Sequence, residues 1–566
     1  MPNQPSTFES PQTLVATDAA NSVVPCKRCP LWKILGMPIV IGLALSFAVS
    51  LGKWLQEEQS RLLFIGLDGM CFYLAIGFVA LIAVVLSIVY LRPSKRTLAI
   101  TGVLIVMACF GSSKLFRIDG YYGNRTPRIA WRWTPEAELQ IKTYLTSKTR
   151  IERIPVPIDF YTPSGNDFPE LLGKDRMAKV NNVELATNWK LQPPTLLWRH
   201  PVGLGWSSFA VVGDAAVSLE QRDENECVVC YEVRTGVELW CHSELTRFKH
   251  EYGDGPRSTP TIRDGRVFSM GATGVLTCID FKSGELVWKQ SVFTDAKSQN
   301  LPFGMSGSPL VFQGMVIVTP GAGVGASAIA YSTDTGSEIW RSGDDQASYA
   351  SPVAATLCGQ MQILSFDGAG LQSYATDGKT LWLQPWVTQG ESRVNVAQPM
   401  VLGPDEIDQS AGTDDSGNPW AKVLISSGYD KGTALLKITR AGKDWFSEII
   451  WESKQLKSKL SNFVVYQNYA YGLDNGLLTC IDLKDGERVW KRGRYGHGKL
   501  LLVKDILLIQ AESGEILLVA ATPDAHTELA KSEALSSKTW NNLALAGDVL
   551  VVRNDREAAA FTLPAK

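Results

Sequence analysis

One motif occurs twice, almost letter for letter, at Leu276–Trp288 and at Leu478–Trp490. Each copy has an alternating strand, a polar turn that carries glycine, and a second strand that ends in tryptophan, which is typical of a β-hairpin. Looser copies end at Trp240, Trp340 and Trp382. Hairpins that recur along a chain indicate a repeat architecture, in which each repeat buries its apolar surface against its neighbours.

The tryptophans that end these copies lie 39 to 69 residues apart, which is about the length of one four-stranded propeller blade. Because they recur at one register, we expect them to pack between blades rather than to line a ligand site. The repeat residues are Trp198, Trp240, Trp288, Trp340, Trp382, Trp451 and Trp490, with Gly236, Gly284, Gly336, Gly378 and Gly486 four residues before five of the tryptophans.

A β-rich segment upstream of each hairpin gives a second count of the blades. These segments begin at Ser207, Ser258, Gly307, Ala350, Ala397, Leu460, Gly498 and Asn541, which predicts eight blades. The last segment supplies only three strands, whereas the strand at Leu196–His200 has no hairpin of its own. We therefore expect Leu196–His200 to complete the eighth blade, since closing the ring removes open sheet edges.

The first part of the chain predicts a membrane anchor. Apolar spans occupy residues 34–51, 71–91 and 98–113, and the second span, without a charged residue, is long enough to cross a bilayer as a helix. Lysines and arginines before the first span and after the second place the N-terminus in the cytoplasm. Three crossings would put the propeller in the periplasm, at the inner membrane. If the third span does not cross, the propeller is cytoplasmic.

These patterns divide the chain into four parts. We expect residues 1–30 to be a disordered cytoplasmic tail, because they are polar and rich in Ser, Thr, Asn and Pro. A transmembrane region follows at 31–116, then a linker or stalk at 117–193 and the propeller at 194–566. Within the linker, a helix is expected from the N-cap Thr134 to about Ser147. The net charge of −2 gives no attraction to nucleic acid.

The cysteines and histidines do not form a recognisable metal or catalytic motif, and no metal site is predicted. Cys230, Cys278 and Cys480 share one register of the repeat, as small buried strand residues do. Cys230 and Cys241 could oppose each other across a hairpin, which in an oxidising compartment permits a disulfide. The acidic stretch 403–418 lacks the spacing of a calcium loop, and we interpret it as a solvated surface loop.

The remaining candidate site is the axis of the ring. In a propeller, the loops that lead into the innermost strands converge around the central channel. Here they carry basic and aromatic side chains, which suit an anionic small molecule or an acidic peptide, although loop residues that simply face water would give the same pattern. The candidates are Trp206, Arg257, Tyr349, Arg393, Asn395, Lys459, Arg494 and His497.

The motif at Cys278–Trp288 and Cys480–Trp490 resembles the tryptophan-docking repeat of PQQ-type (pyrroloquinoline quinone) eight-bladed propellers, and residues 194–235 resemble their membrane-anchored, BamB-like members. The resemblance implies an all-β, eight-bladed propeller behind a transmembrane helical anchor. Some members of this superfamily bind proteins without a cofactor, and others are dehydrogenases that use PQQ and Ca²⁺ to oxidise alcohols or sugars. The expected function is a non-catalytic scaffold for envelope proteins without a cofactor, with the PQQ- and Ca²⁺-dependent dehydrogenase as the alternative. A third hypothesis is that the propeller senses or carries a small anionic ligand.

Overall fold

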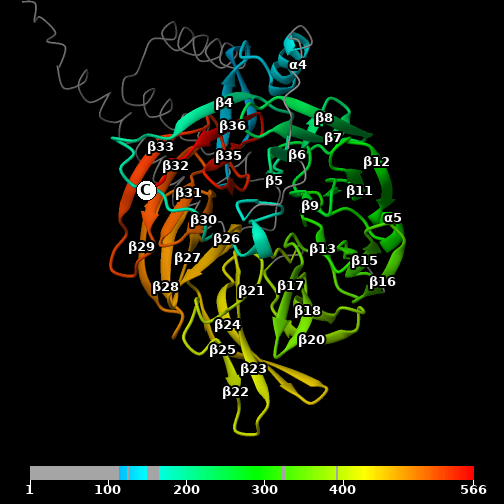
Figure 1. The fold of residues 1–566 in the computed structure, drawn as a ribbon, viewed down its shortest axis with the longest axis vertical. Coiled ribbons are helices and arrows are strands. Elements are labelled where there is room, and N and C mark those ends of the chain that lie inside the picture. Colours follow the sequence, from blue (N-terminus) through cyan, green and yellow to red (C-terminus); the bar gives the residue numbers. More distant parts are fainter. Residues whose placement is uncertain (1–113, 124–125, 149–164, 322–324, 390–392) are drawn as a thin grey trace, which may run out of the picture. The chain divides into compact units, whose positions relative to one another are not determined.

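The computed structural model describes residues 114–123, 126–148, 165–321, 325–389 and 393–566. Most of this part of the chain forms an all-β propeller of eight blades, each an antiparallel sheet of four strands radiating from a central channel (Figure 1). The prediction of eight blades is confirmed. The predicted spans 34–51, 71–91 and 98–113 and the tail 1–30 lie outside the described residues. Among the residues that are described, no helix has both the length and the apolar character needed to cross a bilayer.

The first four blades follow one another in sequence, each running from the innermost to the outermost strand. Blade 1 comprises β5 (Ala210–Val212), β6 (Ala215–Arg222), β7 (Asn225–Glu232) and β8 (Glu238–Leu245). Blade 2 comprises β9 (Thr261–Arg263), β10 (Arg266–Met270), β11 (Val275–Asp280) and β12 (Leu286–Ser291). Blade 3 comprises β13 (Leu310–Phe312), β14 (Met315–Val318), β15 (Ala328–Ser332) and β16 (Glu338–Ser342). Blade 4 comprises β17 (Val353–Leu357), β18 (Gln360–Phe366), β19 (Gly370–Ala375) and β20 (Thr380–Pro385).

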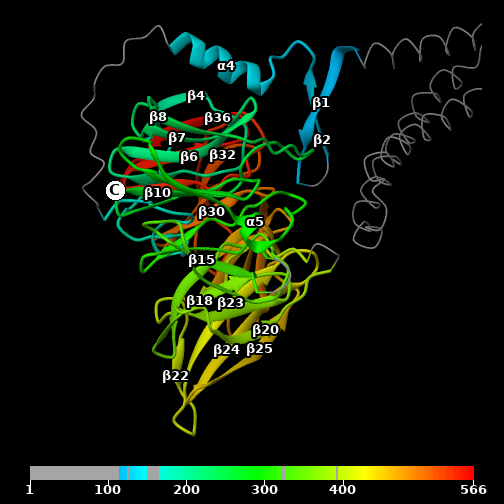
Figure 2. The ribbon, with the colours of Figure 1, turned by 90° about the vertical axis from the view of Figure 1, so that its right-hand side faces the viewer.

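The next three blades keep this order and add two extra strands. Blade 5 comprises β21 (Met400–Val401), β23 (Pro419–Ser427), β24 (Gly432–Ala441) and β25 (Asp444–Ser453), with β22 (Ala411–Thr413) paired to β23. Blade 6 comprises β26 (Ser458–Tyr466), β27 (Tyr469–Asp474), β28 (Leu477–Asp482) and β29 (Arg488–Arg494). Blade 7 comprises β30 (Lys499–Val503), β31 (Ile506–Gln510), β32 (Glu515–Ala520) and β33 (Glu528–Glu533), with β3 (Lys179–Val180) parallel to β30. The long strands of blade 5 project beyond the neighbouring blades (Figures 1 and 2).

Blade 8 closes the ring with strands from both ends of the propeller. It comprises β34 (Ala544–Ala546), β35 (Val549–Arg553), β36 (Glu557–Thr562) and, as the outermost strand, β4 (Thr195–Pro201). β4 pairs antiparallel with β36, and Trp198 lies opposite Ala560. The predicted closure by Leu196–His200 is therefore confirmed.

The repeat tryptophans join each blade to the next. Trp240 of blade 1 lies against Gly284 of blade 2, where a Cβ on the glycine would fall 2.7 Å from the indole ring. The indole N–H of Trp240 also donates to the Phe281 carbonyl of blade 2 over 2.9 Å. The glycine has a φ of 75°, which disfavours other residues at this turn. Four further pairs repeat the glycine contact: Trp198–Gly236, Trp288–Gly336, Trp340–Gly378 and Trp451–Gly486. Trp382 differs, since it donates to Gln362 of its own blade, and Trp490 donates to the Thr522 carbonyl of blade 7.

The cysteine positions correct one prediction. Cys230 lies opposite Trp240 and Cys241 lies opposite Val229, so the two side chains point to opposite faces of the sheet. The predicted Cys230–Cys241 disulfide is therefore wrong, and both cysteines are free. Cys241 instead shares a face with Cys227, and the Sγ atoms of both lie near Ser243 Oγ, at 3.8 and 3.4 Å.

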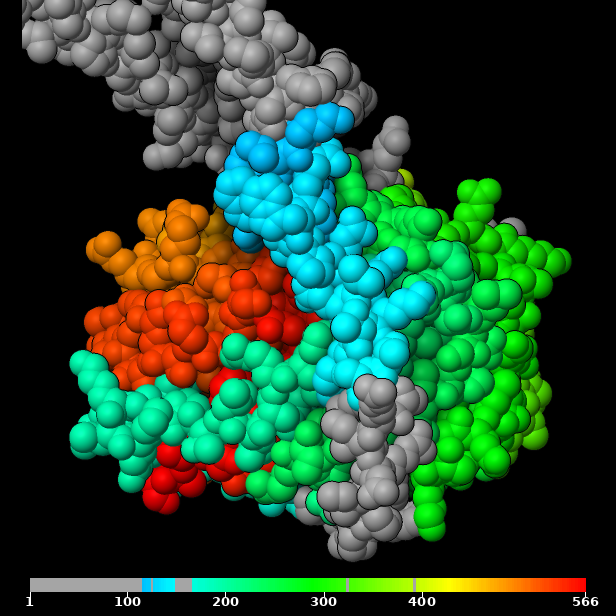
Figure 3. Space-filling model, turned by 90° about the horizontal axis from the view of Figure 1, so that it is seen from above, coloured from blue at the N-terminus to red at the C-terminus, as the bar shows by residue number. Residues whose placement is uncertain are grey.

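The segment predicted to be a linker holds ordered elements that contact the propeller. β1 (Phe116–Tyr121) and β2 (Pro127–Trp131) form an antiparallel hairpin, and helix α4 (Ala137–Lys148) follows close to its predicted limits. α4 contacts β4, and Tyr144 stacks on His200 with ring centres 4.8 Å apart. Figure 3 shows this segment, in blue, lying across the junction of the first and last blades. The remaining helical turns are η2 (Lys174–Arg176) and α5 (Val292–Ala296).

The predicted surface loop at 403–418 is only partly solvated. β22 extends the sheet of blade 5, and Glu406 is buried, with an ion pair of 2.9 Å to Lys179. Glu406 thus joins this stretch to Lys179 of β3, a contact that a freely solvated loop does not make.

Candidate functional site at the central channel

The loops that lead into the innermost strands meet at one end of the channel, which we call the hairpin face because the β1–β2 hairpin lies there. Aromatic side chains from several blades form a continuous cluster at this face. Trp206 of the loop before β5 contacts Trp540 of the loop before β34, with ring centres 4.9 Å apart. Tyr252 lies 6.3 Å from Trp540 and 6.2 Å from Phe303, and Phe303 lies 5.7 Å from Tyr349. Tilted and edge-to-face aromatic pairs of this kind stabilise the packing of the loop ends.

Two of the predicted axis residues belong to this cluster and a third lies beside it. Trp206 and Tyr349 are buried, and the Tyr349 hydroxyl accepts from the Phe303 N–H over 3.4 Å. Arg257 lies 4.5 Å above the ring of Phe248, and its Nη2 donates to the Gly253 carbonyl over 2.7 Å. Burial lowers the pKa of Arg257 to about 10, although Asp254 and Glu226 act in the opposite direction. These three side chains are therefore part of the packing beneath the hairpin face.

Asn395 and Arg393 lie beside this cluster, since the backbone N–H of Tyr349 donates to the Asn395 carbonyl over 2.9 Å. Asn395 is fully buried, where its Nδ2 donates to the Asp367 carbonyl over 2.7 Å and its Oδ1 accepts from Ser427 over 2.6 Å. Its amide is thus used to connect blades 4 and 5. Arg393, with a φ of 41°, is exposed, and its carbonyl accepts from Ser348 over 3.2 Å.

The last three predicted residues lie on blades 6 and 7. Lys459 Nζ lies 5.4 Å from the ring of Tyr429, and Arg494 lines an open cavity of about 340 Å³. The backbone N–H of His497 donates to Glu512 over 3.0 Å. Burial, with the nearby Lys459, lowers the pKa of His497 to about 4, so this histidine is neutral at physiological pH.

The β1–β2 hairpin packs directly on this face through its turn. The N–H of Gly123 donates to Glu512 Oε1 over 2.9 Å, and Trp540 Nε1 donates to the same oxygen over 2.8 Å. A Cβ at Gly123 would fall 2.0 Å from the ring of His497, so only glycine allows this approach. The hairpin turn is therefore fitted to blades 7 and 8.

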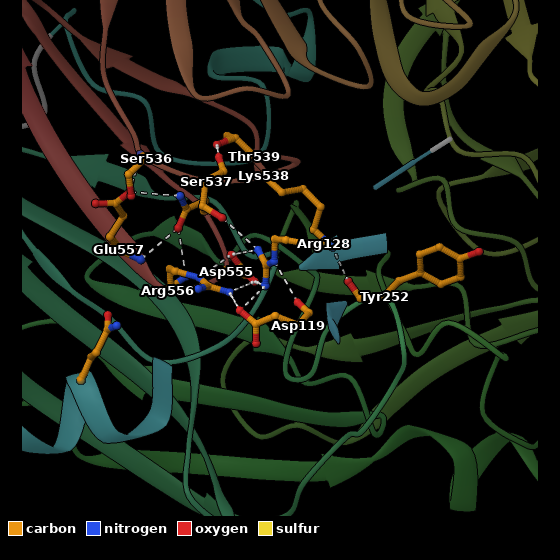
Figure 4. A network of polar contacts seen from close by, with 12 residues as sticks. Asp119, Arg128, Tyr252, Ser536, Ser537, Lys538, Thr539, Asp555, Arg556 and Glu557 are labelled. Atoms are coloured by element: carbon orange, nitrogen blue, oxygen red, sulfur yellow. Dashed lines mark hydrogen bonds and ion pairs between the residues drawn. The ribbon is translucent and has the colours of Figure 1, made fainter. Parts of the chain in front are cut away.

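An ion network centred on Asp555 fastens the hairpin to blade 8 (Figure 4). Arg128 donates to both carboxylate oxygens of Asp555, over 3.2 and 2.8 Å, and to the Ser537 hydroxyl over 2.9 Å. Arg556 Nη2 pairs with Asp119 of β1 over 3.0 Å. Burial alone would raise the pKa of Asp555, but Arg556 and Arg128 outweigh it and hold this pKa at about 2. The carboxylate is thus ionised and held between cations from two parts of the chain.

Lys538 adds a second link between the hairpin and the ring. Its Nζ donates to the carbonyls of Tyr121 and Tyr252, over 2.7 and 2.9 Å, and lies 4.1 and 4.7 Å from the rings of Trp540 and Trp206. Burial lowers the pKa of Lys538 to about 7 despite the nearby Asp555. The ammonium group of Lys538 therefore binds backbone and aromatic groups of the chain itself rather than a ligand.

Residues 165–185, which we call the channel plug, fill the channel among the innermost strands. Phe168 exchanges backbone hydrogen bonds of 2.8 Å with Val211 of β5, while β3 pairs with β30 on blade 7. Arg176 is buried, and its Nε donates to Glu170 over 2.6 Å. Its other nitrogens donate to carbonyls at the start of blades 3 and 4, those of Ser308, Pro309 and Pro352. Four non-glycine residues of the plug have positive φ, a strained backbone that the surrounding blades hold in place: Leu172, Asp175, Arg176 and Ala178.

The described residues do not fit PQQ with Ca²⁺ on the axis. Calcium takes six to eight oxygen ligands, several of them carboxylates. Within the described ranges, no group of three or more His, Cys, Asp or Glu side chains is arranged to hold a metal ion. At the hairpin face, Asp555 is instead bound by Arg128 and Arg556, and deep in the channel Glu170 is paired with Arg176.

Sequence reasoning missed Lys538, Trp540 and Asp555, which carry the hairpin contacts. The first two could have been found, because they lie in the loop before Asn541 and correspond to the loops inspected in the other blades. Arg128 and Arg176 gave no sequence signal, since both lie in a segment without repeats. Their partners come from blades far along the chain.

The eight closed blades and the tryptophan contacts define the kind of propeller. A family model described as outer membrane protein assembly factor BamB matches residues 224–492, from β7 to β29. The blades within this range are therefore similar to the family that this model describes. None of the curated protein sequences matches the chain.

Solved structures also resemble this propeller. BamB from Moraxella catarrhalis is 13% identical with a TM-score of 0.46, over 65% of this chain and 100% of that chain. A europium-containing methanol dehydrogenase is 11% identical with a TM-score of 0.40, over 71% and 98%. A quinohemoprotein alcohol dehydrogenase from Comamonas testosteroni is 13% identical with a TM-score of 0.40, over 71% and 81%. These likenesses concern the fold alone.

Proposed function

We propose that this chain is a membrane-anchored PQQ-like propeller that acts as a non-catalytic scaffold for protein partners at the cell envelope. The observation that carries the proposal is the filling of the channel by the chain itself. The plug occupies the interior through Arg176, and the hairpin covers the loop end through Arg128 and Gly123. A propeller used in this way offers its blade surfaces and turns rather than an axial pocket.

Three features support the location and the partner class. The apolar spans would anchor the chain in the inner membrane, and the charge pattern would place the propeller in the periplasm. The family model that matches is named for assembly of outer membrane proteins, so other envelope proteins are the partners that we propose. A fusion of alkaline phosphatase to the C-terminus would test the side of the membrane. This enzyme is active only outside the cytoplasm, so the proposal expects the fusion to be active.

The projecting part of blade 5 is the surface that we propose for a protein partner. The outer strand β25 is ten residues long and exposes Phe446, Ile449 and Ile450 along its length. Lys422 and Lys437 lie over the Trp420 ring on the adjoining strands, at 5.8 and 5.6 Å. A long edge strand with apolar side chains and flanking cations suits a partner that presents apolar and acidic side chains.

One titration separates the scaffold from the dehydrogenase. The full chain, purified in detergent, is titrated with PQQ and CaCl₂ while its melting temperature and dye reduction with alcohols and aldoses are followed. A ligand at a hundred times its dissociation constant would stabilise the folded state by about 2.7 kcal/mol. The scaffold proposal expects neither a change in melting temperature nor turnover, and a saturable rise with dye reduction would overturn it.

A positive test uses a photo-crosslinking residue at Phe446 in cells. The proposal expects one discrete adduct with an envelope protein, which weakens when Lys422 and Lys437 are changed to glutamate. The same crosslinker at Val287, an exposed residue of the outer strand of blade 2, is the matched control. Equal adducts at both positions would show that blade 5 is not the partner surface.

A further inference from the structure

The β1–β2 hairpin has two faces of opposite chemistry. Asp119 and Arg128 point toward the propeller, where they join the ion network with Asp555 and Arg556. On the other face, Ile118 lies opposite Ile129 and Phe116 lies opposite Trp131 across the two strands. Because side chains alternate along a strand, the contacts with blade 8 force this second, apolar face outward.

The outward face is large, aromatic and exposed. Phe116 and Trp131 have ring centres 4.3 Å apart, and Trp131 stacks on Trp133 at 4.7 Å. The exposed fraction is 61% for Ile129 and 65% for Trp133. We call this set the aromatic face: Leu115, Phe116, Ile118, Ile129, Trp131 and Trp133. A contiguous apolar patch of this composition indicates a contact with another apolar phase rather than with water.

The residues that precede the hairpin indicate that this apolar phase is a lipid bilayer. The predicted span 98–113 ends directly before Lys114, so no linker separates its end from the aromatic face. Tryptophan is enriched where a bilayer meets water, because its ring is apolar and its N–H finds a polar partner. Lys114 and Arg132 flank the aromatic face, and Arg132 Nε donates to the Phe116 carbonyl over 3.2 Å, which places a cation at the edge of this face.

We propose that the aromatic face of the β1–β2 hairpin inserts into the headgroup region of the bilayer. This proposal rests on the membrane anchor proposed above. Since Arg128 and Gly123 fasten the other side of the same hairpin to blades 7 and 8, the insertion fixes the orientation of the propeller, with its hairpin face toward the lipid. The hairpin then works as a rigid spacer between membrane and ring.

The test is photo-crosslinking of the full chain in lipid nanodiscs. A benzophenone amino acid replaces Ile129 in one variant and, as the control, Phe446 of blade 5, which is similarly exposed at 57%. Mass spectrometry then distinguishes lipid adducts from crosslinks within the chain. We expect roughly tenfold more lipid adduct at position 129 than at position 446, because only the former lies at the interface.

Three other outcomes overturn the proposal in distinguishable ways. If position 129 crosslinks to residues 1–113 or to another protein, the aromatic face is covered by protein and not by lipid. If alkaline carbonate extracts the full chain from membranes, the anchor itself is absent, and both this inference and that part of the proposed function fail. Retention in the carbonate pellet without lipid adducts at position 129 refutes the hairpin insertion alone.

Discussion

Replacing Asp555 by asparagine should release the β1–β2 hairpin from the hairpin face. The substitution keeps the size of the side chain but removes the carboxylate charge that Asp555 of blade 8 places among Arg128, Arg556 and Lys538. Arg128 would then face an amide that can accept only one of its two hydrogen bonds well. The three cations would also repel one another at close range.

The magnitude follows from the pKa of Asp555. This pKa is about 2, against a usual value of 3.8, and each pKa unit corresponds to roughly 1.4 kcal/mol. The ionised carboxylate is therefore favoured by roughly 2.5 kcal/mol in the folded state, which sets the scale of the loss in the Asp555→Asn variant. Because the folded-state pKa is the lower one, this contribution is present above about pH 4 and disappears as the pH falls toward 2.

Hydrogen–deuterium exchange of peptides that cover residues 115–132 measures the release. At neutral pH the Asp555→Asn variant should exchange these amides up to roughly 70-fold faster than the wild type, since the full 2.5 kcal/mol corresponds to that ratio of open states. The melting temperatures of the two proteins should converge between pH 4 and pH 2. Asp548→Asn is the control, because Asp548 pairs with Arg234 at the surface, where an ion pair contributes under about 1 kcal/mol. Unchanged hairpin exchange in Asp555→Asn would refute the reasoning.

Three further predictions concern the blades and the plug. Gly284→Ala should lower the free energy of unfolding by roughly 2–4 kcal/mol in denaturant titrations, because its Cβ would meet the indole of Trp240 at a positive φ. Arg176→Met should lower it by roughly 3–5 kcal/mol by the same measurement, since the buried carboxylate that Arg176 neutralises loses its partner. Mild oxidation of the full chain should join Cys227 to Cys241, which peptide mapping would detect: the hydrogen bond from Cys241 lowers the pKa of Cys227 and favours its thiolate.

Each of these predictions has a matched control. Gly265→Ala adds a methyl group at a similar φ of 71° but with no atom within 4 Å. An equal loss of stability in this variant would show that the contact with Trp240 is not the cause. Arg263→Met removes the exposed second partner of Glu170 and should change stability by under about 1 kcal/mol. For the thiols, a disulfide that contained Cys230 would contradict the observed strand register.

The blades were predictable because their signals are local and repeat. Trp240 and Gly284 recur in the same relation in several blades, so the sequence predicts both the number of blades and the contact between neighbours. The unpaired strand at Leu196–His200 likewise predicted the closure of the ring. The last of the eight segments supplies only three strands, so its blade needs a fourth strand from elsewhere in the chain. Local turn chemistry and strand alternation are enough for such features.

The channel contents were not predictable in this way. Gly123 and Glu512 lie 389 residues apart in the chain, and Arg556 and Asp119 lie 437 residues apart. No periodicity links such positions, and a glycine or an arginine in a linker has many uses. The predicted disulfide between Cys230 and Cys241 was wrong for a related reason: one extra residue at the β-bulge after Cys230 decides which side chains share a face.

The strand β4 has a consequence for how this protein is made. It leaves the ribosome before strands β5 to β36 of the ring, yet its partner β36 is the last of those strands to be synthesised. Until then, β4 is an unpaired edge, and the contacts of the hairpin and the plug with blades 7 and 8 cannot form either. Contacts of such long sequence separation form slowly and expose intermediate states to aggregation. The ring therefore closes only after β36 has been synthesised, and a chain that stops before Glu557 leaves β4 without its partner strand.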